Sequence, residues 1–388
     1  MYATLYATSY TIEVYRIYLM QNECLGRQIV KLQPGVFDDL ENDKNIIIDL
    51  SFDGSFSIYT GFFDSNFVEQ VLKKRSDVDF VEKVVPVEAN SPIRPNILKR
   101  TNLEKRTTQS SAPYNLDRID QNNYPLDGQY TYPNNAGSES NIYVVDTGIA
   151  IENVEFEGRA SFGGTFCSNC STTDDHGHGT NVAGIVGGKN FGVAKKTKLI
   201  AVKVLNQNGQ GTSATVTAGI SFVITKHQNS SNKNTIINLS LSAGFSDAIN
   251  KIVSDSINAG IHVVASAGDN DGDACSFSPS SVTQAIVVGS TEKNSNAAIS
   301  SSNSGSCVDI YAPGRDIIAA GIGQTNSLSI SSGTSQACPH VAGAIALIIS
   351  KSGNKTPSTM RNTLVSLAVK NLLTNGANPN TFLKIPAP

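Results

Sequence analysis

The sequence is poor in the residues that mark several common classes of protein. It has no tryptophan, three methionines and six cysteines among 388 residues. Six cysteines are too few for a small domain stabilised mainly by disulfides, although they allow one or two bridges. No run approaches the roughly eighteen apolar residues that a membrane-spanning helix needs. The first twenty residues lack a basic start followed by an apolar block, so no secretory signal peptide is predicted.

An excess of positive charge is missing as well. The 30 basic and 33 acidic residues give a net charge of −3. This balance argues against a nucleic-acid partner, because proteins that bind one present a basic surface to the phosphates. The length exceeds the usual size of a single domain, so we expect two structural units.

The first unit, from about Arg27 to Ala89, has the pattern of a small α+β domain. A helix is predicted to begin at Ser65, a favourable N-cap, and Glu69 and Lys73 are spaced for an ion pair on it. The buried face of this helix is expected to comprise Phe67, Val68, Val71 and Leu72. Four segments have the composition of strands: Ile29–Leu32, Asn45–Leu50, Ser55–Thr60 and Val78–Val87.

A linker follows this unit. The stretch from Asn90 to Ser111 contains two prolines and two basic pairs, Lys99-Arg100 and Lys105-Arg106. One interpretation is a plain solvated hinge. The other is a maturation site that is cut between Lys99 and Ser111, most favourably after Arg106.

Beyond the linker, short apolar runs alternate with helix-length segments. Continuous Val and Ile runs indicate strands that are covered on both faces. Alternation with helices implies a parallel sheet whose functional residues gather at the carboxyl ends of the strands. The predicted strands are Ile142–Val145, Leu199–Leu205, Thr235–Leu241, Ile261–Ala265, Ile286–Val288 and Val308–Ala312, and the predicted helices include Ser213–His227 and Ser246–Asn258.

The segment Ser332–Gly343 is the strongest local signal. A sharply turned Gly333-Thr334-Ser335 leads into Val341–Ile349, which is apolar on every side and therefore predicts a buried helix. Ser335 is expected at the exposed start of that helix, where unpaired N–H groups and partial positive charge suit an oxyanion. Pro339 has no N–H to donate to the carbonyl of Ser335, which loosens the first turn.

The run from Gly333 to Gly343 resembles the serine motif of the subtilisin-like serine peptidases, and most closely that of the proteinase K branch. The resemblance extends over most of residues 112–373. It implies an α/β, three-layer, subtilisin-like fold with a central, mostly parallel sheet in residues 107–388. It also implies a small α+β (ferredoxin-like) inhibitory propeptide within residues 1–106, since Phe67–Gln70 and Asp77–Glu82 resemble such a propeptide. Ala112–Ile119 resembles the start of a mature enzyme of this branch.

A serine nucleophile needs a base that an acid orients. Asp146 directly follows the predicted strand Ile142–Val145 and is a candidate for that acid. Among the histidines, His340 lies about 140° around the helix from Ser335 and cannot take its proton. His227, in a polar loop, and His262, in a strand, are interpreted as structural.

The residues alone leave His176 and His178 open as the base. His178–Gly184 resembles the histidine motif of the family, and Asp146-Thr147-Gly148-Ile149 resembles its acid motif. The resemblance therefore implies a catalytic triad of Asp146, His178 and Ser335, in the order that subtilisin itself has.

Three positions depart from the family pattern. Asn181 replaces a histidine, from which we expect a modest effect. Gln336 replaces a methionine beside the cleft, which puts the shape of the subsites in doubt. Asp269 stands where the family places an asparagine that donates to the oxyanion. An ionised carboxylate cannot donate and repels the intermediate, whereas a protonated one can donate. Asn270 is the alternative donor if the turn is shifted.

The substrate is expected to bind as an added strand between two chain edges. By resemblance these edges are Gly209-Gln210-Gly211 and Leu241-Ser242-Ala243-Gly244. The second edge and Ala265–Gly268 would wall the specificity pocket. Their small uncharged residues favour an apolar or aromatic residue before the scissile bond.

The resemblance also implies a disulfide between Cys275 and Cys307, and a structural calcium site formed by Thr283, Ala285 and Asp309. Cys338 is expected to be a buried thiol beside Ser335. Cys167 and Cys170, with His176 and His178, mimic a zinc ligand set. Their cramped spacing instead favours a local bridge or two free thiols.

Together these features predict a serine endopeptidase that is secreted (extracellular or vacuolar) and made as a zymogen. Its partners would be protein or peptide substrates and its own propeptide as inhibitor, with no nucleic acid, no membrane and no organic cofactor, and it would be a monomer. Two alternatives remain. One is a pseudoprotease that binds peptides without turnover, for which Asp269 argues. The other is a zinc-dependent hydrolase that uses the Cys/His cluster.

Overall fold

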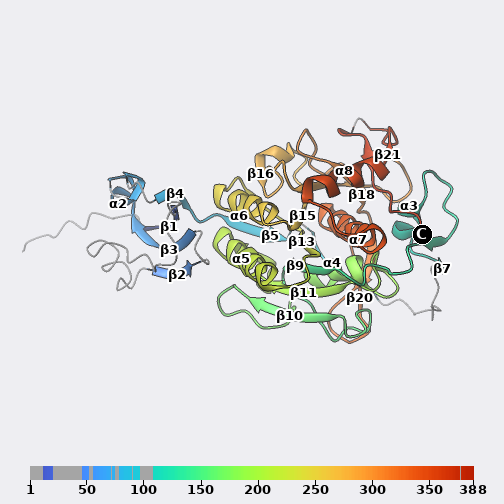
Figure 1. The fold of residues 1–388 in the computed structure, drawn as a ribbon, viewed down its shortest axis with the longest axis horizontal. Coiled ribbons are helices and arrows are strands. Elements are labelled where there is room, and N and C mark those ends of the chain that lie inside the picture. Colours follow the sequence, from blue (N-terminus) through green and yellow to red (C-terminus); the bar gives the residue numbers. More distant parts are fainter. Residues whose placement is uncertain are drawn as a thin grey trace, which may run out of the picture. The chain divides into compact units, whose positions relative to one another are not determined.

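The structure is a computed structural model that describes residues 12–20, 46–51, 56–70, 72–74, 78–89, 91–96 and 108–388 apart from residue 376 (Figure 1). The chain divides into two compact units, Met1–Val85 and Pro86–Pro388. The boundary between the units lies at Val85/Pro86, about twenty residues before the proposed maturation boundary at residues 106/107. The difference arises because residues 86–96 contribute strands to sheets of the second unit.

The first unit contains an antiparallel four-stranded sheet in the order β2-β3-β1-β4. A helix, α2 (Ser65–Gln70), begins at the predicted residue, and a single helical turn, η1 (Leu72–Lys74), comes after it in the sequence. Val68 and Leu72 are fully buried and Lys73 Nζ lies 2.6 Å from Glu69 Oε1, as predicted. Val71 lies outside the described residues. The strands are β1 (Ile12–Met20), β2 (Ile46–Ser51), β3 (Phe56–Asp64) and β4 (Val78–Lys83).

Two predictions for this region need correction. The first unit does not begin near Arg27, because β1 already pairs with both β3 and β4. The single strand predicted over Val78–Val87 is wrong. β4 ends at Lys83, and β5 (Pro86–Ala89) belongs to a sheet of the second unit. The predicted strand Ile29–Leu32 lies outside the described residues.

The second unit is organised around a nine-stranded sheet in the order β10-β11-β9-β13-β15-β17-β18-β22-β21. All neighbours are parallel except β22 and β21, which confirms the predicted α/β fold. The strands are β9 (Asn141–Asp146), β10 (Ala160–Thr165), β11 (Lys198–Lys203), β13 (Thr235–Leu239), β15 (His262–Ser266), β17 (Ile286–Thr291), β18 (Ile310–Pro313), β21 (Val369–Lys370) and β22 (Thr381–Phe382).

Helices cover both faces of this sheet (Figure 1). α5 (Ser213–Asn229) and α6 (Asp247–Asn258) pack together on one face, and α4 (His178–Gly187) and α7 (Thr334–Ser352) on the other. The predicted starts of α5 and α6 are confirmed. Thr212 forms a capping box before α5, and the Ser246 hydroxyl accepts from the N–H of Ile249 in α6. Two further helices are α3 (Tyr114–Asp120) and α8 (Pro357–Leu367).

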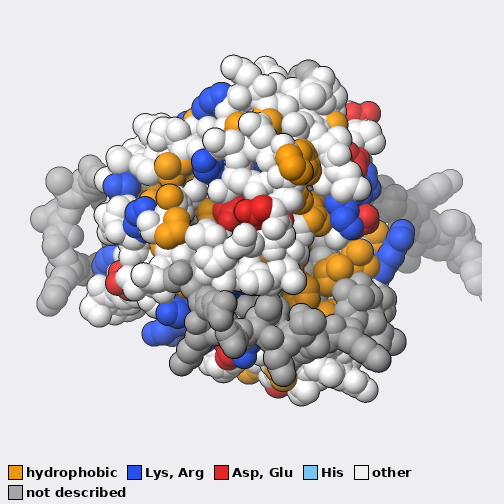
Figure 2. Space-filling view, turned by 90° about the vertical axis from the view of Figure 1, so that its right-hand side faces the viewer, with side chains coloured by type: hydrophobic (Ala, Val, Ile, Leu, Met, Phe, Trp, Pro, Cys, Tyr) orange, Lys and Arg blue, Asp and Glu red, His pale blue; other side chains and the backbone are white. Residues whose placement is uncertain are grey.

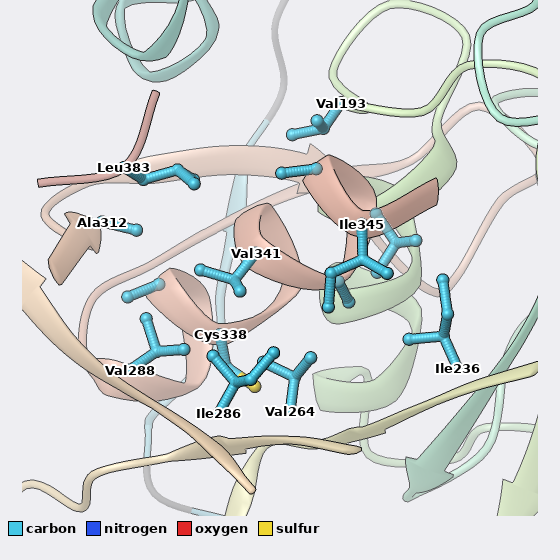
Figure 3. Packing of buried hydrophobic residues seen from close by; sticks show 14 of the residues in the cluster. Val193, Ile236, Val264, Ile286, Val288, Ala312, Cys338, Val341, Ile345 and Leu383 are labelled. Carbon is cyan, nitrogen blue, oxygen red and sulfur yellow. The ribbon is translucent and has the colours of Figure 1, made fainter. Parts of the chain in front are cut away.

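The helix α7 lies in the centre of the core, as its apolar sequence predicts. Every residue from Thr334 to Ser350 is buried. Figure 3 shows Cys338, Val341 and Ile345 of this helix among side chains of the parallel strands, including Val264 and Ile286. This burial fixes the position of the first turn of α7, where Ser335 lies.

Smaller sheets lie beside the central one. The strands β12 (Gln210–Thr212), β5, β14 (Leu241–Gly244) and β16 (Phe277–Ser278) form one of them in that order. The strands β19 (Ile317–Ala320), β20 (Leu328–Ser331) and β6 (Arg94–Asn96) form another. β7 (Thr108–Ser110) pairs with β8 (Gln129–Thr131). The strand predicted over Thr235–Leu241 is therefore two strands in two sheets, β13 and β14, with the break at Ser240.

The surface carries scattered charge. On the face in Figure 2, side chains of both signs are interspersed with uncharged ones, and the hydrophobic side chains form small groups. Among the described residues, no helix has both the length and the apolar character to cross a membrane.

Candidate active site

Two of the predicted site residues are in direct contact at the carboxyl edge of the central sheet. Asp146 is the last residue of β9, and His178 is the first residue of α4. The Nδ1 of His178 lies 2.8 Å from Oδ1 and 3.0 Å from Oδ2 of Asp146, and both side chains are fully buried. Burial is the largest single influence and lowers the pKa of His178, but Asp146, together with the charges of Asp174 and Asp269, outweighs it, and the pKa is raised above its usual 6.5.

The loop before His178 is held by a buried carboxylate that sequence reasoning missed. Oδ1 of Asp174 accepts from the Thr147 hydroxyl at 2.9 Å and from the N–H of Gly177 at 2.8 Å, and its Oδ2 accepts from the N–H of Thr180 at 2.9 Å. Asp174 thus caps α4 and ties it to the residue after Asp146. The available signal was an acidic residue shortly before the histidine motif, but no helix was predicted to begin at His178.

The structure separates the two candidate histidines. His176 does not contact Asp146; its Nδ1 accepts from the N–H of His178 at 3.3 Å. Its Nε2 lies 3.0 Å from the position that a Cβ on Gly209 would take. Burial, followed by the charge on His178, lowers the pKa of His176. His176 therefore lies beside the first predicted substrate edge.

The other histidines have structural partners. His340 is buried between Asn115 and the carbonyl of Gln336, both at 2.8 Å, and burial lowers its pKa to about 4. His262 Nε2 bonds the side chain of Asn354 at 2.7 Å. His227 lies in α5 rather than in a loop, and its Nδ1 bonds the Thr235 hydroxyl at 2.9 Å.

Ser335 lies in the first turn of α7 but is buried, not exposed as predicted. Its hydroxyl donates to the carbonyl of Ser240 at 2.9 Å, and the Ser240 hydroxyl donates to the carbonyl of Ser335 at 2.8 Å. Ser91 of the linker covers this turn. Its hydroxyl oxygen would overlap with a Cβ on Gly333, so it is in close contact with Gly333. Meanwhile His178 Nε2 is buried and has no hydrogen-bond partner in the described part of the chain.

Asp269 acts as an acceptor in this structure. Its Oδ1 accepts from the N–H of Thr334 at 2.9 Å and its Oδ2 from the Thr334 hydroxyl at 3.2 Å. Burial raises the pKa of Asp269 to about 6 against the effect of these hydrogen bonds. The predicted alternative donor, Asn270, is exposed and contributes only its backbone N–H, to Asn303 Oδ1 at 3.0 Å.

Asn303 is a second residue that sequence reasoning missed. It is fully buried, and its amide crosslinks the loop that carries Asp269. Nδ2 donates to the carbonyl of Ala267 at 2.9 Å, and Oδ1 accepts from the N–H of Gly272 at 2.9 Å. It lies far away in the sequence, and no local pattern marks it.

The two predicted substrate edges lie on either side of one strand of the same chain. β5 pairs antiparallel with β12, Val87 opposite Gly211, and with β14, Glu88 opposite Ser242. The N–H of Ala89 donates to the carbonyl of Gly209 at 2.9 Å. The two edges are therefore spaced to hold an extended peptide between them.

Gln336 does not line a cleft as predicted. Its side chain is fully buried, and its Nε2 donates to Asn181 Oδ1 at 3.4 Å. Two of the departures from the family pattern thus meet each other between α4 and α7.

The described part of the chain contains two disulfides. The bond between Cys275 and Cys307 confirms the predicted pair. Cys167 and Cys170 form a local bridge, which removes two of the four ligands of the zinc alternative. Within the described ranges, no group of three or more His, Cys, Asp or Glu side chains is arranged to hold a metal. Cys338 is a buried free thiol, as expected.

The residues proposed for calcium do not fit that ion. Oδ1 of Asp309 accepts from Nε of Arg361 at 2.9 Å and from its Nη2, and Oδ2 accepts from the N–H of Val287 at 2.9 Å. Both carboxylate oxygens are therefore engaged. The guanidinium supplies the positive charge that calcium would bring, so the predicted set of Thr283, Ala285 and Asp309 has no free carboxylate.

Known proteins resemble this chain over most of the second unit. The model of the subtilase family matches residues 137–383. Subtilisin-like protease 3 of Pseudogymnoascus destructans is 45% identical over 275 residues, which are 69% of this chain and 67% of the relative. The extracellular serine proteinase of a Thermus species is 43% identical over 281 residues, 72% of this chain and 67% of the relative. The chain thus spans about two thirds of the length of these relatives.

A solved structure agrees with this similarity. The crystal structure of a cold adapted subtilisin-like serine proteinase superimposes with a TM-score of 0.68 at 39% identity. The match covers 72% of this chain and 100% of the other.

Proposed function

Because the chain belongs to the subtilase family of serine endopeptidases, we propose that Asp146, His178 and Ser335 form its catalytic triad. His178 Nε2 would take the proton of the Ser335 hydroxyl as the oxygen attacks a peptide carbonyl. Asp146 would hold the proton on Nδ1 and stabilise the imidazolium. The observation that carries the proposal is the buried Asp146–His178 hydrogen bond beside the start of α7.

The hydrogen bond from Ser335 to the carbonyl of Ser240 suggests how substrate would prime the nucleophile. A peptide that extends the β14 register by one residue presents an N–H to that carbonyl. This N–H displaces the Ser335 hydroxyl, which then turns toward the free Nε2 of His178. The base and the nucleophile thus come into contact when a peptide is bound.

The test is turnover of a peptide by the full chain and two variants. Ser335→Ala should abolish hydrolysis. Asp146→Asn should lower kcat by roughly 10⁴, as in other triads, because the imidazole then holds the wrong tautomer. Unchanged turnover in either variant would refute the assignment.

A second candidate is a pseudoprotease that binds peptides without cleaving them. It is favoured by one observation, the acceptor role of Asp269 at the position expected to donate to the oxyanion. Tight peptide binding without turnover in the wild type would support it.

We also propose that the chain is a zymogen that its own segment inhibits. β5 occupies both substrate edges, and Ser91 lies against Gly333 at the start of α7. The first cut would then fall on one of the two peptide bonds between Ala89 and Ser91, and the cut near Arg106 would follow it. The Ser335→Ala chain should stay full-length, and a first N-terminus near residue 106 would contradict this order.

The substrate preference follows from the same strand. Val87 is fully buried between Gly211 and Ala243, which supports an apolar side chain at the third or fourth substrate residue before the cut. The expected apolar or aromatic preference directly before the cut rests on the small walls around Ala243. The extracellular relative supports a secreted enzyme that acts on proteins or peptides.

A further inference from the structure

The outer edge of the β19–β20 hairpin holds a second segment of the linker. β6 pairs antiparallel with β20, with Arg94 opposite Ile330, Pro95 opposite Ser329 and Asn96 opposite Leu328. This pairing lies on the opposite side of the proposed cut from β5.

The alternation of the ladder shows which groups face β6. The N–H of Gly321 donates to the carbonyl of Ser327, so the backbone groups of Ser327 and Ser329 point toward β19. Because backbone groups alternate along a strand, those of Leu328 and Ile330 point toward β6. Pro95, which has no N–H, falls opposite Ser329, at the position where no donor is needed.

The linker residues between β6 and the candidate active site also contact the second unit. The Ser331 hydroxyl donates to the carbonyl of Pro92 at 2.8 Å. Ile93 and Ile322 both lie over Gly177, 3.7 and 3.3 Å from the position of a Cβ there. The chain therefore contacts the site continuously from Ser91 to Asn96.

We infer that, once the linker has been removed, the free edge of β20 binds the substrate itself. The occupant is an extended segment that begins four or five residues after the scissile bond and is added as an antiparallel strand. This inference rests on the proposed function and extends its substrate class to polypeptides that are extended well beyond the cut.

Main-chain contacts should dominate this recognition. The side chain of Arg94 is exposed, so the edge reads the backbone rather than a particular residue at this position. Each added hydrogen bond contributes about three- to tenfold in affinity. Long substrates should therefore have a higher kcat/KM than short ones. Proline should be tolerated at the substrate position that lies opposite Ser329, as Pro95 does here.

The experiment compares two fluorogenic peptides of this chain's own sequence, residues 85–93 and residues 85–98. The enzyme is the full chain after self-processing, with its N-terminus determined. The longer peptide should have a kcat/KM about tenfold higher. An ester in place of the amide N–H of Arg94 or of Asn96 should remove most of that gain.

The matched control is Pro95→Ala in the longer peptide, which adds an N–H at the position facing away from β20 and should change nothing. Equal kcat/KM for both peptides, or insensitivity to the esters, would overturn the inference alone. A processed enzyme that retains residues 91–96 would overturn it too, because β6 would keep the edge. Failure to cut either peptide would instead refute the proposed function.

Discussion

The side-chain amides of Asn181 on α4 and Gln336 on α7 lie 3.4 Å apart, and both are fully buried. Asn181 also donates to the carbonyl and the hydroxyl of Ser329, at 3.3 and 3.0 Å. Gln336 Oε1, by contrast, has no hydrogen-bond partner among the described residues. The helices that carry His178 and Ser335 are thus linked by a pair of amides. The hydrogen-bonding groups of Asn181 have partners, whereas the oxygen of Gln336 has none among the described residues.

We expect Gln336→Met to raise the free energy of unfolding by about 1 kcal/mol, because it removes a buried acceptor without a partner and loses only a long hydrogen bond. Asn181→Ala should lower it by about 1–3 kcal/mol, since Ser329 and Gln336 lose a partner. Urea unfolding in a Ser335→Ala background avoids self-digestion. A clear loss of stability in Gln336→Met would mean that Oε1 has a partner such as an ordered water.

Much of the fold could be predicted because the buried strands have a recognisable apolar sequence pattern. β9, β15 and β17 each contain a short apolar run with two or three Val or Ile residues, which is typical of strands in a sheet covered on both faces. The break at Ser240 was not predicted, since the run Thr235–Leu241 contains neither glycine nor proline. At the break, Ser240 exchanges hydrogen bonds with Ser335, which is 95 residues away in the sequence and leaves no local signal.

The candidate site shows the same limit. The motifs marked Asp146, His178 and Ser335, but not the carboxylate of Asp174 or the amide of Asn303 that hold the adjoining loops. Asp309 and Arg361 are separated by 52 residues. A pairing over that distance leaves no trace in composition or periodicity. The ion pair of Asp309 with the guanidinium of Arg361, which replaces the predicted calcium, therefore could not be predicted from the sequence.

Asp269→Asn should raise turnover of a peptide by at least about tenfold near neutral pH. Loss of one oxyanion donor costs about 10²–10³ in subtilisin, a relative of this chain. With a pKa of about 6, Asp269 is ionised at pH 7 and cannot donate, whereas His178 must be neutral to accept and its pKa is raised. Few molecules hold both required states, so the wild-type profile should be narrow. An amide does not titrate, and its oxygen can still accept from Thr334.

The measurement for Asp269 is steady-state kinetics of wild type and variant from pH 4 to 10, with the alkaline side broadened in the variant. Asp269→Ala is the control: it removes the negative charge and the acceptor for Thr334 without adding a donor, so it should gain less activity than Asp269→Asn. Equal or lower turnover in Asp269→Asn would show that the site is organised around an acid.

Removal of calcium should leave the melting temperature unchanged, because Arg361 already neutralises Asp309. Arg361→Gln should lower the free energy of unfolding by about 1–3 kcal/mol, less than for a fully buried pair since Arg361 is partly exposed. Added calcium should restore part of that loss only in the variant. Thermal scans with and without a chelator test whether the wild type binds calcium. A fall in its melting temperature on chelation would show that it does.

The two disulfides should differ in their contribution to stability. Cys275–Cys307 spans 32 residues, so its loss should cost about 3–4 kcal/mol on the loop-entropy model. Cys167–Cys170 spans 3 residues and should cost about 2 kcal/mol or less. Paired Cys→Ser variants, again with Ser335→Ala, provide the comparison by urea unfolding. A larger loss for the local bridge would contradict this ranking.

The most direct test of the triad is covalent labelling of Ser335 by a serine-directed fluorophosphonate, located by peptide mass spectrometry. Labelling requires a hydroxyl that a neighbouring base activates. The self-processed wild type should be labelled at Ser335. A folded His178→Ala protein, cut in the linker by an added protease because it cannot process itself, should not be labelled, since the base is missing. A folded wild type without label, or label at another serine, would contradict the assignment of Ser335 as the nucleophile.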